Sequence, residues 1–428
     1  MKEQGQISFL VAVLISINVI VGGGIYFGPQ IMASYAGNFS FLGWIFAAIL
    51  LAPIIWSVAS AAKMFPGTGG FYNYCTTGIN DTAGFIAIWA YFLGYTATGA
   101  TLTRVLKDHI LGAPETQTLY TALFSNLLIV VVVCALNLLS VSVISKVQSI
   151  GTILKLLPLF FVIVLFGFYW DSSMTFDLGS AANIGSAIPM AIFGFWGVET
   201  CCSIGHYLKG GPSKAFGVIL TAFLSAMLLY SLFHFGLLHI MGAQNLATFG
   251  VAAFPGFLNL KSTFLASLLS WSIIVALGIT FFNTIYGVVL LAIDNLLCLA
   301  GKRLTFFASS LTVLNRFSRP YVTIFVQGVV VFLLVTFITS KAILAALSNL
   351  GVLISFLLTI IAVAKVQIEK QAYKPLVITL LSIPTWGLLA YYSWVQAGAD
   401  QLSRLMYTSP LLIGIVLGFV MFYMNKKK

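Results

Sequence analysis

The feature that most constrains this chain is a series of long apolar segments that runs almost without interruption from one end to the other. Hydrophobic residues make up 60% of the 428 positions, charged residues make up 7%, and the mean hydropathy is +1.05. A soluble domain carries about 25% charged residues, so this chain has too few to cover a water-facing surface. We therefore expect an all-α integral membrane protein.

Charges, prolines and glycine clusters divide the apolar sequence into twelve predicted membrane-spanning helices, because one crossing needs about 20 apolar residues. The eighth segment is expected to include a flanking interfacial helix. The predicted spans cover residues 8–36, 40–63, 82–106, 118–140, 145–169, 184–206, 214–242, 262–300, 317–339, 341–365, 373–397 and 404–424. The first is interpreted as a span and not as a cleaved signal peptide, since no small-residue cleavage site follows it.

The distribution of basic residues predicts the orientation. With the N-terminus inside, fifteen Lys and Arg residues fall on the cytoplasmic side, five fall on the opposite side, and Lys155 lies within a span. Positive residues concentrate in cytoplasmic loops. We therefore expect a multi-pass protein of the inner (plasma) membrane with both termini in the cytoplasm. The net charge of +11 is then a signal of topology, and no nucleic-acid partner is expected.

Several functional classes find no support in the sequence. The five cysteines form no C-x-x-C pair, and no H-E-x-x-H or G-x-S-x-G motif is present, so we expect no metal, no cofactor and no enzymatic activity. A channel is also disfavoured, because no span repeats polar residues at a pore-lining period.

Two predicted spans contain glycine-rich interruptions. Residues 18–25 (NVIVGGGI) lie in the middle of span 1, and residues 193–200 (FGFWGVET) lie in the middle of span 6. Each of the three consecutive glycines in span 1 costs a helix roughly 1 kcal/mol. Glycines also serve simply to let membrane helices pack closely. A matched pair of interrupted spans, however, is the sequence pattern that points to a transporter binding site.

The chemistry of a broken helix predicts what these interruptions bind. The first N–H groups of a half-helix carry a partial positive charge, and those of Gly22 to Ile25 suit a carboxylate. The carbonyl groups released before each break suit an ammonium group. A zwitterionic amino acid satisfies both sets. The predicted substrate-binding residues are Ile20, Val21, Gly22, Gly23, Gly24, Ile25, Phe193, Gly194, Phe195 and Trp196.

At these residues the chain resembles the amino acid–polyamine–organocation superfamily, whose members have the leucine-transporter fold. Four motifs carry the resemblance, which extends over essentially the whole chain. They are VGGGIY at residues 21–26, FPGTGGFYNY at 65–74, FWGVET at 195–200 and AIDN at 292–295.

This resemblance implies a fold, a mechanism and a gate. The fold is a five-plus-five inverted repeat, with residues 1–170 and 184–366 as the two halves, helices 1 and 6 discontinuous, and residues 373–428 as two accessory helices. The mechanism is alternating access, with the gate at Phe193. Some basic-amino-acid antiporters of the group carry Trp at that gate, so Phe193 is a departure that puts arginine/agmatine exchange in doubt.

Lys155 is the first of two candidate coupling residues. It lies about ten residues into span 5, and an intramembrane charge is a functional candidate because its insertion costs at least ~2.5–3.5 kcal/mol. The alternative is a lysine that reaches the membrane surface. In sodium-independent relatives a lysine that resembles this one takes the place of a cation, in contact with spans 1 and 8. Lys155 would then remove the need for sodium and make proton coupling possible.

Glu199 is the second coupling candidate, because it follows the break in span 6 by about two residues. It is interpreted either as a static cap on the lower half-helix or as a group that takes up and releases a proton. Polar residues of spans 3 and 8 are further candidates for the pocket lining, although such groups also serve as interhelical hydrogen bonds. These are Tyr95, Thr98, Thr101, Asn283 and Thr284. His234 and His239 are expected to be core or interface residues.

Together these features predict a sodium-independent secondary active transporter of amino acids, either proton-coupled or working by exchange. The alternative on the same fold is a carrier of polyamines, of other small organic cations or of nucleobases. The expected partners are the amino acid substrate and membrane lipid, and the protein is expected to be a monomer or a homodimer.

Overall fold

The computed structural model describes residues 8–65, 70–112, 118–168, 181–199, 214–258 and 262–426. Within these ranges the regular structure is helical, apart from an isolated bridge between Leu314 and Pro320. Eight of the described helices are long and apolar enough to cross a membrane, and three apolar helices are shorter. The chain is therefore an integral membrane helical protein, as its composition predicts.

The helices of the first part of the chain are α1 (Phe9–Ile20), α2 (Gly24–Ala36), α3 (Leu42–Met64), α4 (Gly70–Gly78), α5 (Asp81–Leu111), α6 (Leu119–Asn137), α7 (Val141–Phe166) and α9 (Ile184–Phe195). Those of the second part are α10 (Ala215–Met241), α11 (Ala243–Phe249), α12 (Thr263–Gly301), α13 (Ala308–Leu311), α14 (Tyr321–Phe337), α15 (Lys341–Glu369), α16 (Tyr373–Gln396) and α17 (Gln401–Lys426). Every predicted span overlaps one of these helices or a pair of them. That all twelve cross the membrane stays a prediction.

The eighth predicted segment differs from its prediction. It was expected to contain a separate interfacial helix, but Thr263–Gly301 forms one continuous helix of 39 residues. At about 1.5 Å per residue this helix measures about 58 Å, well beyond a hydrocarbon core of about 30 Å. The segment contains no proline, so nothing interrupts its backbone ladder. Short helical elements lie before it instead, in α11 and in the 3-10 helix η5 (Val251–Phe257).

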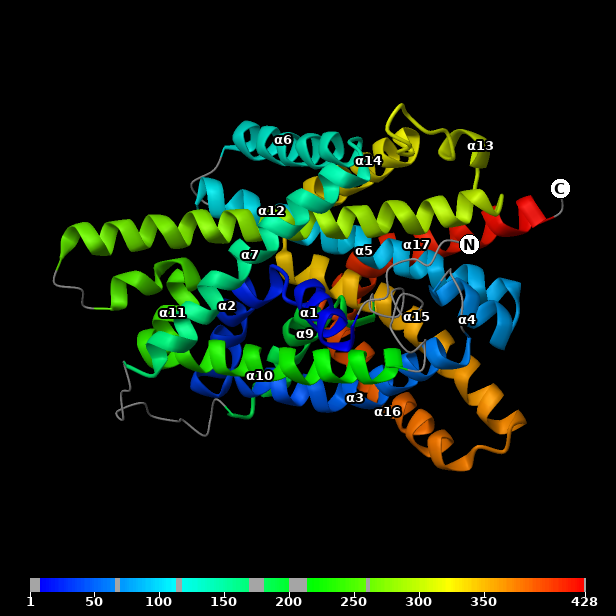
Figure 1. Cartoon of the computed structure of the whole chain (residues 1–428), viewed down its shortest axis with the longest axis horizontal. Coiled ribbons are helices and arrows are strands. Elements are labelled where there is room, and N and C mark those ends of the chain that lie inside the picture. Colours follow the sequence, from blue (N-terminus) through cyan, green and yellow to red (C-terminus); the bar gives the residue numbers. More distant parts are fainter. Residues whose placement is uncertain are drawn as a thin grey trace.

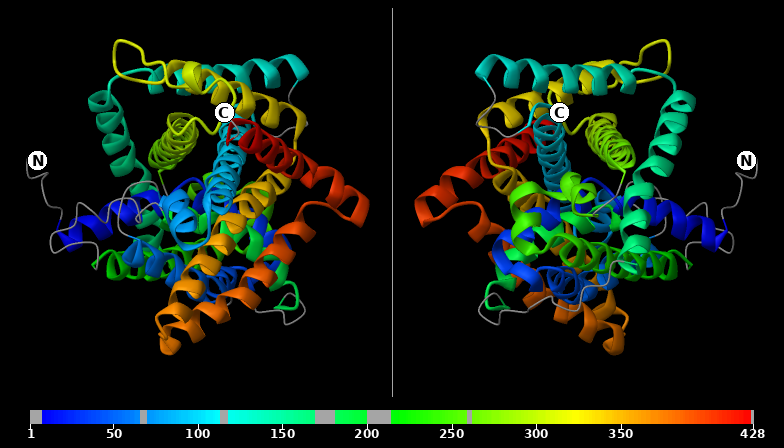
Figure 2. Two further views of the ribbon diagram at one scale, coloured as in Figure 1. Left: turned by 90° about the vertical axis from the view of Figure 1, so that its right-hand side faces the viewer. Right: turned by 90° about the vertical axis from the view of Figure 1, so that its left-hand side faces the viewer.

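The long helices run roughly along one axis of the molecule (Figure 1). The described C-terminal end of α17, the helix α4 and the α13 segment lie at one end of this axis, and α11 lies at the other. Figure 2 shows α5 near the centre of the bundle, with α6 and the helices α16 and α17 toward its periphery. Most of α5 is buried, whereas much of α6 is exposed. The core of the protein is therefore organised around α5.

Small residues permit the close packing of α5 on α15. A Cβ atom added to Gly351 would lie 2.6 Å from the Cα of Gly94. Such proximity is possible only between two glycines, and it brings the two backbones together in the way that small residues allow in membrane helices. Because this contact fixes α5, the polar residues on the face of α5 toward the interrupted helices have fixed positions.

Candidate functional site

The first interruption lies between α1 and α2, as predicted. The N–H of Val21 still donates to the carbonyl oxygen of Ile17 (2.8 Å), and the next backbone bond is from the N–H of Tyr26 to Gly23 (2.9 Å). Gly23 caps α2 without any side-chain hydrogen bond, and the residues around it are buried. A buried helix N-terminus without a side-chain cap is a place where an anionic group is stabilised.

The second interruption lies within the predicted motif, about two residues before Glu199. Phe193, Gly194 and Phe195 form the end of α9, and the chain leaves the helix at Trp196 and Gly197. Gly197 has a φ of +112°, which favours glycine. Gly194 serves packing instead, because a Cβ at this position would lie 2.5 Å from the ring of Trp44. The rest of this motif, from residue 200 onward, lies outside the described residues.

The two interrupted helices meet. A Cβ added to Gly24 would lie 3.0 Å from the Cα of Gly194. The hydroxyl of Tyr230 on α10 donates to the carbonyl oxygens of Ile20 (2.7 Å) and Gly194 (3.2 Å). One side chain therefore ties together the ends of α1 and α9.

These bonds bear on the predicted ammonium site. The carbonyl of Phe193 also accepts a hydrogen bond, from the N–H of Trp196 (3.3 Å). Three of the carbonyl groups assigned to the ammonium, those of Ile20, Phe193 and Gly194, therefore already have a partner. Each carbonyl keeps a second acceptor position. No local pattern in the sequence predicts the bonds of Tyr230, because this residue lies on a different helix.

A cavity of about 220 Å³ lies at the meeting point of the two breaks. Eight of the residues singled out from the sequence line it: Ile20, Gly22, Gly23, Gly24, Lys155, Phe193, Gly194 and Trp196. Tyr95, Thr98, Asn283 and Thr284 also line it, as expected of polar residues on spans 3 and 8. Sequence reasoning missed the apolar part of the lining, which includes Leu102, Val288, Leu290 and Leu291.

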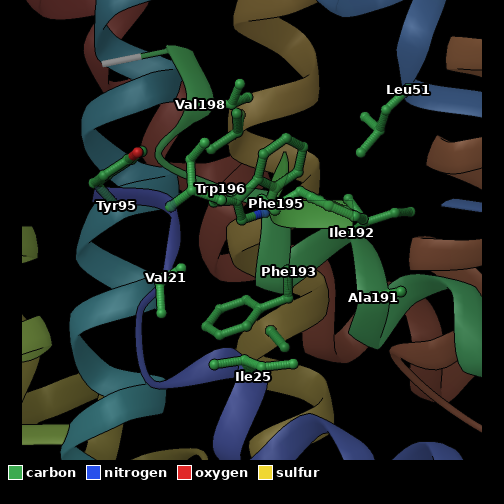
Figure 3. Packing of buried hydrophobic residues seen from close by; sticks show 14 of the residues in the cluster. Val21, Ile25, Leu51, Tyr95, Ala191, Ile192, Phe193, Phe195, Trp196 and Val198 are labelled. Atoms are coloured by element: carbon green, nitrogen blue, oxygen red, sulfur yellow. The ribbon is translucent and has the colours of Figure 1, made fainter. Parts of the chain in front are cut away.

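Other predicted residues lie outside this lining. Val21, Ile25, Phe195 and Glu199 are buried next to it, and Thr101 bonds to the carbonyl of Ala97 on its own helix (2.8 Å). The ring of Phe195 packs edge-on against Trp44, with centroids 5.9 Å apart. Figure 3 shows Phe193 pointing toward Val21 and Ile25, at the junction of the two helices.

Phe193, the predicted gate, forms part of an aromatic contact between the breaks. Its ring packs edge-on against Phe27 of α2, with centroids 5.7 Å apart. Its side chain therefore both contacts α2 and lines the cavity. A gating role stays a prediction.

Lys155 lies on α7, and 4% of its surface is exposed. It therefore does not reach the membrane surface in this structure, contrary to the alternative considered from the sequence. Its backbone carbonyl accepts a hydrogen bond from the hydroxyl of Tyr26 on α2. The lysine lines the same cavity as Gly22 of span 1 and Thr284 of span 8, the two spans that the resemblance places beside it.

Glu199 is held by three donors, and 2% of its surface is exposed. Its Oε1 accepts hydrogen bonds from the hydroxyls of Tyr91 (3.1 Å) and Tyr95 (2.6 Å) on α5. Its Oε2 accepts one from the N–H of Gly197 (3.1 Å). An ionised carboxylate is a pure acceptor, so this arrangement suits the charged form. It links the second break to the central helix.

Trp196 links the same break to α15. Its indole N–H donates to the Oδ1 of Asn349 (2.6 Å), and the amide of Asn349 donates to the carbonyl of Pro189 on α9 (3.0 Å). Asn349 was not singled out from the sequence, because an isolated asparagine in a membrane helix has no distinctive spacing.

His234 has the core role expected of it. It is fully buried, its Nδ1 accepts from the indole N–H of Trp44 (3.0 Å), and its Nε2 lies 3.1 Å from the hydroxyl of Ser40. A neutral imidazole with its proton on Nε2 satisfies both contacts. In the described part of the chain no cluster of three or more His, Cys, Asp or Glu side chains is placed to hold a metal.

A bundle of apolar helices around a solute-sized cavity at two helix breaks is the architecture of a membrane transport protein. The family described as amino acid permease matches residues 7–419, and the chain belongs to that family. It is thus an amino acid transporter of the amino acid–polyamine–organocation superfamily, and not an enzyme.

Individual relatives are more distant. The serine/threonine exchanger SteT of Bacillus subtilis is 26% identical over 74% of this chain and 69% of the exchanger. An arginine/agmatine antiporter of Chlamydia caviae is 27% identical over 61% of this chain and 60% of the antiporter. An L-lysine transport protein of Corynebacterium glutamicum is 30% identical, but over only 40% of this chain and 36% of that protein.

Proposed function

We propose that this chain is a sodium-independent secondary transporter that moves a small neutral amino acid across the inner membrane by alternating access, either with protons or by exchange. The observation that carries the proposal is the uncapped N-terminus of α2 at the cavity. Gly22, Gly23 and Gly24 line that cavity, and no side chain caps this helix end. A substrate carboxylate supplies the missing anionic partner.

The charge of the lining favours a zwitterion with a neutral side chain. Among the described lining residues, Lys155 is the only charged one. A polyamine or a lysine side chain would bring a further positive charge into a low-dielectric site whose described lining contains no carboxylate, and the neighbouring carboxylate of Glu199 already accepts bonds from Tyr91, Tyr95 and Gly197, so the added charge is costly. The polyamine alternative is therefore disfavoured.

The size of the cavity favours a small substrate. Ligand pockets usually measure about 300–1,000 Å³, and this cavity measures about 220 Å³. The ring of Phe193 and the indole of Trp196 line the cavity and take up part of its space. Thr98 and Thr284 also line it, and their hydroxyl oxygens can still accept a hydrogen bond. Serine, threonine and alanine are the amino acids of suitable size, and a serine/threonine exchanger is among the relatives.

The position of Lys155 supports the absence of a sodium requirement. Its side chain lines the cavity between span 1 and span 8, so its ammonium occupies the region where a coupling cation would otherwise lie. Loss of its proton would change the charge of the site, which provides a route for proton coupling. The five-plus-five repeat, the cytoplasmic termini and the monomeric or dimeric state belong to the same proposal.

Counterflow in proteoliposomes tests the proposal. Vesicles loaded with unlabelled serine should accumulate labelled serine equally well in sodium and in choline buffers. External alanine and threonine should compete, whereas ethanolamine, which lacks the carboxylate of serine, should not. Competition by ethanolamine equal to that by serine would refute the role of the α2 N-terminus. A steep dependence on sodium would refute the role of Lys155.

A further inference from the structure

A second and larger cavity lies away from the substrate site. It measures about 580 Å³ and lies between α5, α14, α17 and the segment that joins α12 to α14. It shares no lining residue with the first cavity. Most of its lining is hydrocarbon, including Leu93, Val326, Leu347 and Leu417. Its chemistry is therefore that of a site for an apolar chain and not for an amino acid.

One end of this cavity is polar. Thr305 lines it, 2% of the residue is exposed, and its hydroxyl has no hydrogen-bond partner among the described residues. Ser310, which is exposed, lines the same end. A buried hydroxyl without a partner is unfavourable, so Thr305 indicates that the natural occupant of the cavity carries an acceptor or donor oxygen at this end.

The segment that bears Thr305 is basic and aromatic. From residue 302 to residue 319 it contains four basic residues and no acidic one. Arg319 is buried and donates to the carbonyl of Asn137 (3.0 Å). The other three bases, Lys302, Arg303 and Arg316, are exposed, and none of them makes an ion pair in the described part of the chain. In the proposed topology this segment faces the cytoplasm.

The rim of the cavity suits the membrane interface. Phe306 and Phe307 both line the cavity and are exposed to 41% and 82%. Exposed aromatic rings beside basic residues are typical of segments at the level of lipid headgroups. The cavity is therefore accessible from the lipid at the depth where a headgroup lies.

We propose that this cavity binds one anionic phospholipid of the cytoplasmic leaflet. An acyl chain fills the apolar slot between α5, α14 and α17, a glycerol or ester oxygen accepts the hydrogen bond of Thr305, and the phosphate pairs with Lys302 and Arg303. Lys302 lies over the ring of Tyr72, 4.4 Å from its centroid, and has no anionic partner among the described residues. The face of a second copy of this chain would bring further apolar side chains but would leave the Thr305 hydroxyl without a partner and the bases without an anion. A lipid with an anionic headgroup satisfies all three features.

The lipid would act on the central helix. Trp89, Leu93 and Thr96 of α5 line this cavity, and Trp89 also donates to the carbonyl of Gly414 on α17 (2.8 Å). Tyr91 and Tyr95 of the same helix hold Glu199 at the second break. An acyl chain in this cavity packs against the face of α5 opposite to Tyr91 and Tyr95. Lipid binding should therefore stabilise the helix that holds Glu199 at the substrate site.

The test uses the full-length protein, delipidated in detergent, with dioleoylphosphatidylglycerol and dioleoylphosphatidylcholine as matched anionic and zwitterionic probes. Native mass spectrometry should show one retained phosphatidylglycerol, and this lipid should raise the Tm more than phosphatidylcholine does.

Val326→Trp, which fills the slot, should weaken phosphatidylglycerol binding at least tenfold. Lys302→Ala/Arg303→Ala should abolish the preference between the two lipids. Lys370→Ala/Lys374→Ala, at the end of α15 and the start of α16, is the matched control and should change neither.

Thr305→Val gives a test that does not depend on filling the slot. Without lipid the variant should be at least as stable as the wild type, because the unpaired hydroxyl is gone, whereas with phosphatidylglycerol it should bind more weakly. Equal stabilisation of the wild type by both lipids would overturn the proposal. A preference for phosphatidylglycerol that persists in both Val326→Trp and Lys302→Ala/Arg303→Ala would also overturn it. If Val326→Trp instead converts a dimer to a monomer, the slot is the contact surface for a second copy of the chain and the proposal is wrong.

Discussion

The two helix breaks are built differently although they meet at one cavity. The break between α1 and α2 is formed mainly by backbone, with three glycines and no side-chain cap. The hydroxyl of Tyr230 bonds to the carbonyl of Ile20 before it, and Tyr26 in the first turn after it bonds to the carbonyl of Lys155. The break after α9 is fixed by side chains, through Glu199 to α5 and through Trp196 to α15. The first break has no side-chain cap, so its N–H groups are available to a ligand. The second break is bonded to two neighbouring helices, so it holds the ligand site in position.

This difference indicates which part of the site is rigid. The second break shares hydrogen bonds with α5 and α15, two helices in direct glycine-to-glycine contact. The first break depends on packing against Gly194 and on Tyr230. We therefore expect changes at the second break to reduce stability and transport together, and changes at the first break to act mainly on the substrate.

The largest effect is expected where the two breaks touch. Gly194→Ala would place a Cβ 2.5 Å from the Trp44 ring, and such overpacking costs about 1–3 kcal/mol. Thermal unfolding should show this loss, and counterflow should be abolished. Gly387→Ala in α16 is the control, since its Cβ would meet nothing within 4 Å and alanine favours a helix by roughly 0.5–1 kcal/mol. A Gly194→Ala protein as stable as the control would contradict the close contact.

The next effect concerns the anchored break. Glu199→Gln keeps the shape of the side chain but leaves one acceptor oxygen for three donors. We expect a loss of about 1.5 kcal/mol, the lower value for hydrogen bonds to charged groups, with slower transport. The exposed Glu369→Gln serves as the control. If the variant unfolds at the same Tm as the wild type, Glu199 is protonated in the folded protein and the three bonds do not depend on its charge.

A smaller effect is expected at the backbone-built break. Tyr230→Phe removes the donor to Ile20 and Gly194, which should cost about 0.5–1.5 kcal/mol. Because it frees these two carbonyls, the apparent affinity for serine should change more than the Tm does. Tyr286→Phe, whose hydroxyl makes one long bond of 3.4 Å to Leu136, is the matched control. Equal affinities in both variants would show that the Ile20 and Gly194 carbonyls take no part in binding.

The smallest effect is expected at a helix start that does have a cap. The N–H of Ser403 donates to Asp400 (2.8 Å) at the start of α17, and this backbone bond is the main cause that lowers the pKa of Asp400 below its ordinary value. A lowered pKa means that the stabilisation is present above the ordinary value and is lost as the pH falls through the folded value. The Tm difference between wild type and Asp400→Asn should therefore be small at about pH 7 and should shrink steadily as the pH is lowered below about 3.9, the ordinary value for an aspartate. A difference that persists in acid would contradict the cap.

The sequence predicted the helical elements well, because each depends on local hydrophobicity. The limits of α3, α10 and α16 agree with their predicted spans to within one or two residues. The eighth segment was expected to include a flanking interfacial helix, but it contains no proline and forms one continuous helix. The first break was predictable from three adjacent glycines. The second break was predictable from its glycines, but the packing role of Gly194 was not, because it depends on the ring of Trp44, a residue 150 positions away in sequence.

By itself the sequence determined that this protein lies in a membrane, where its helices run and which two of them are interrupted, since composition, apolar length and glycine clusters act along the chain. Only the tertiary structure decided that Lys155 and Gly22 line one cavity, that Tyr230 occupies carbonyls at both breaks, that Glu199 bonds to α5, and that Thr305 faces a separate apolar slot. These facts depend on which helix faces pack against each other. Contacts between segments far apart in the chain leave no local pattern in the sequence.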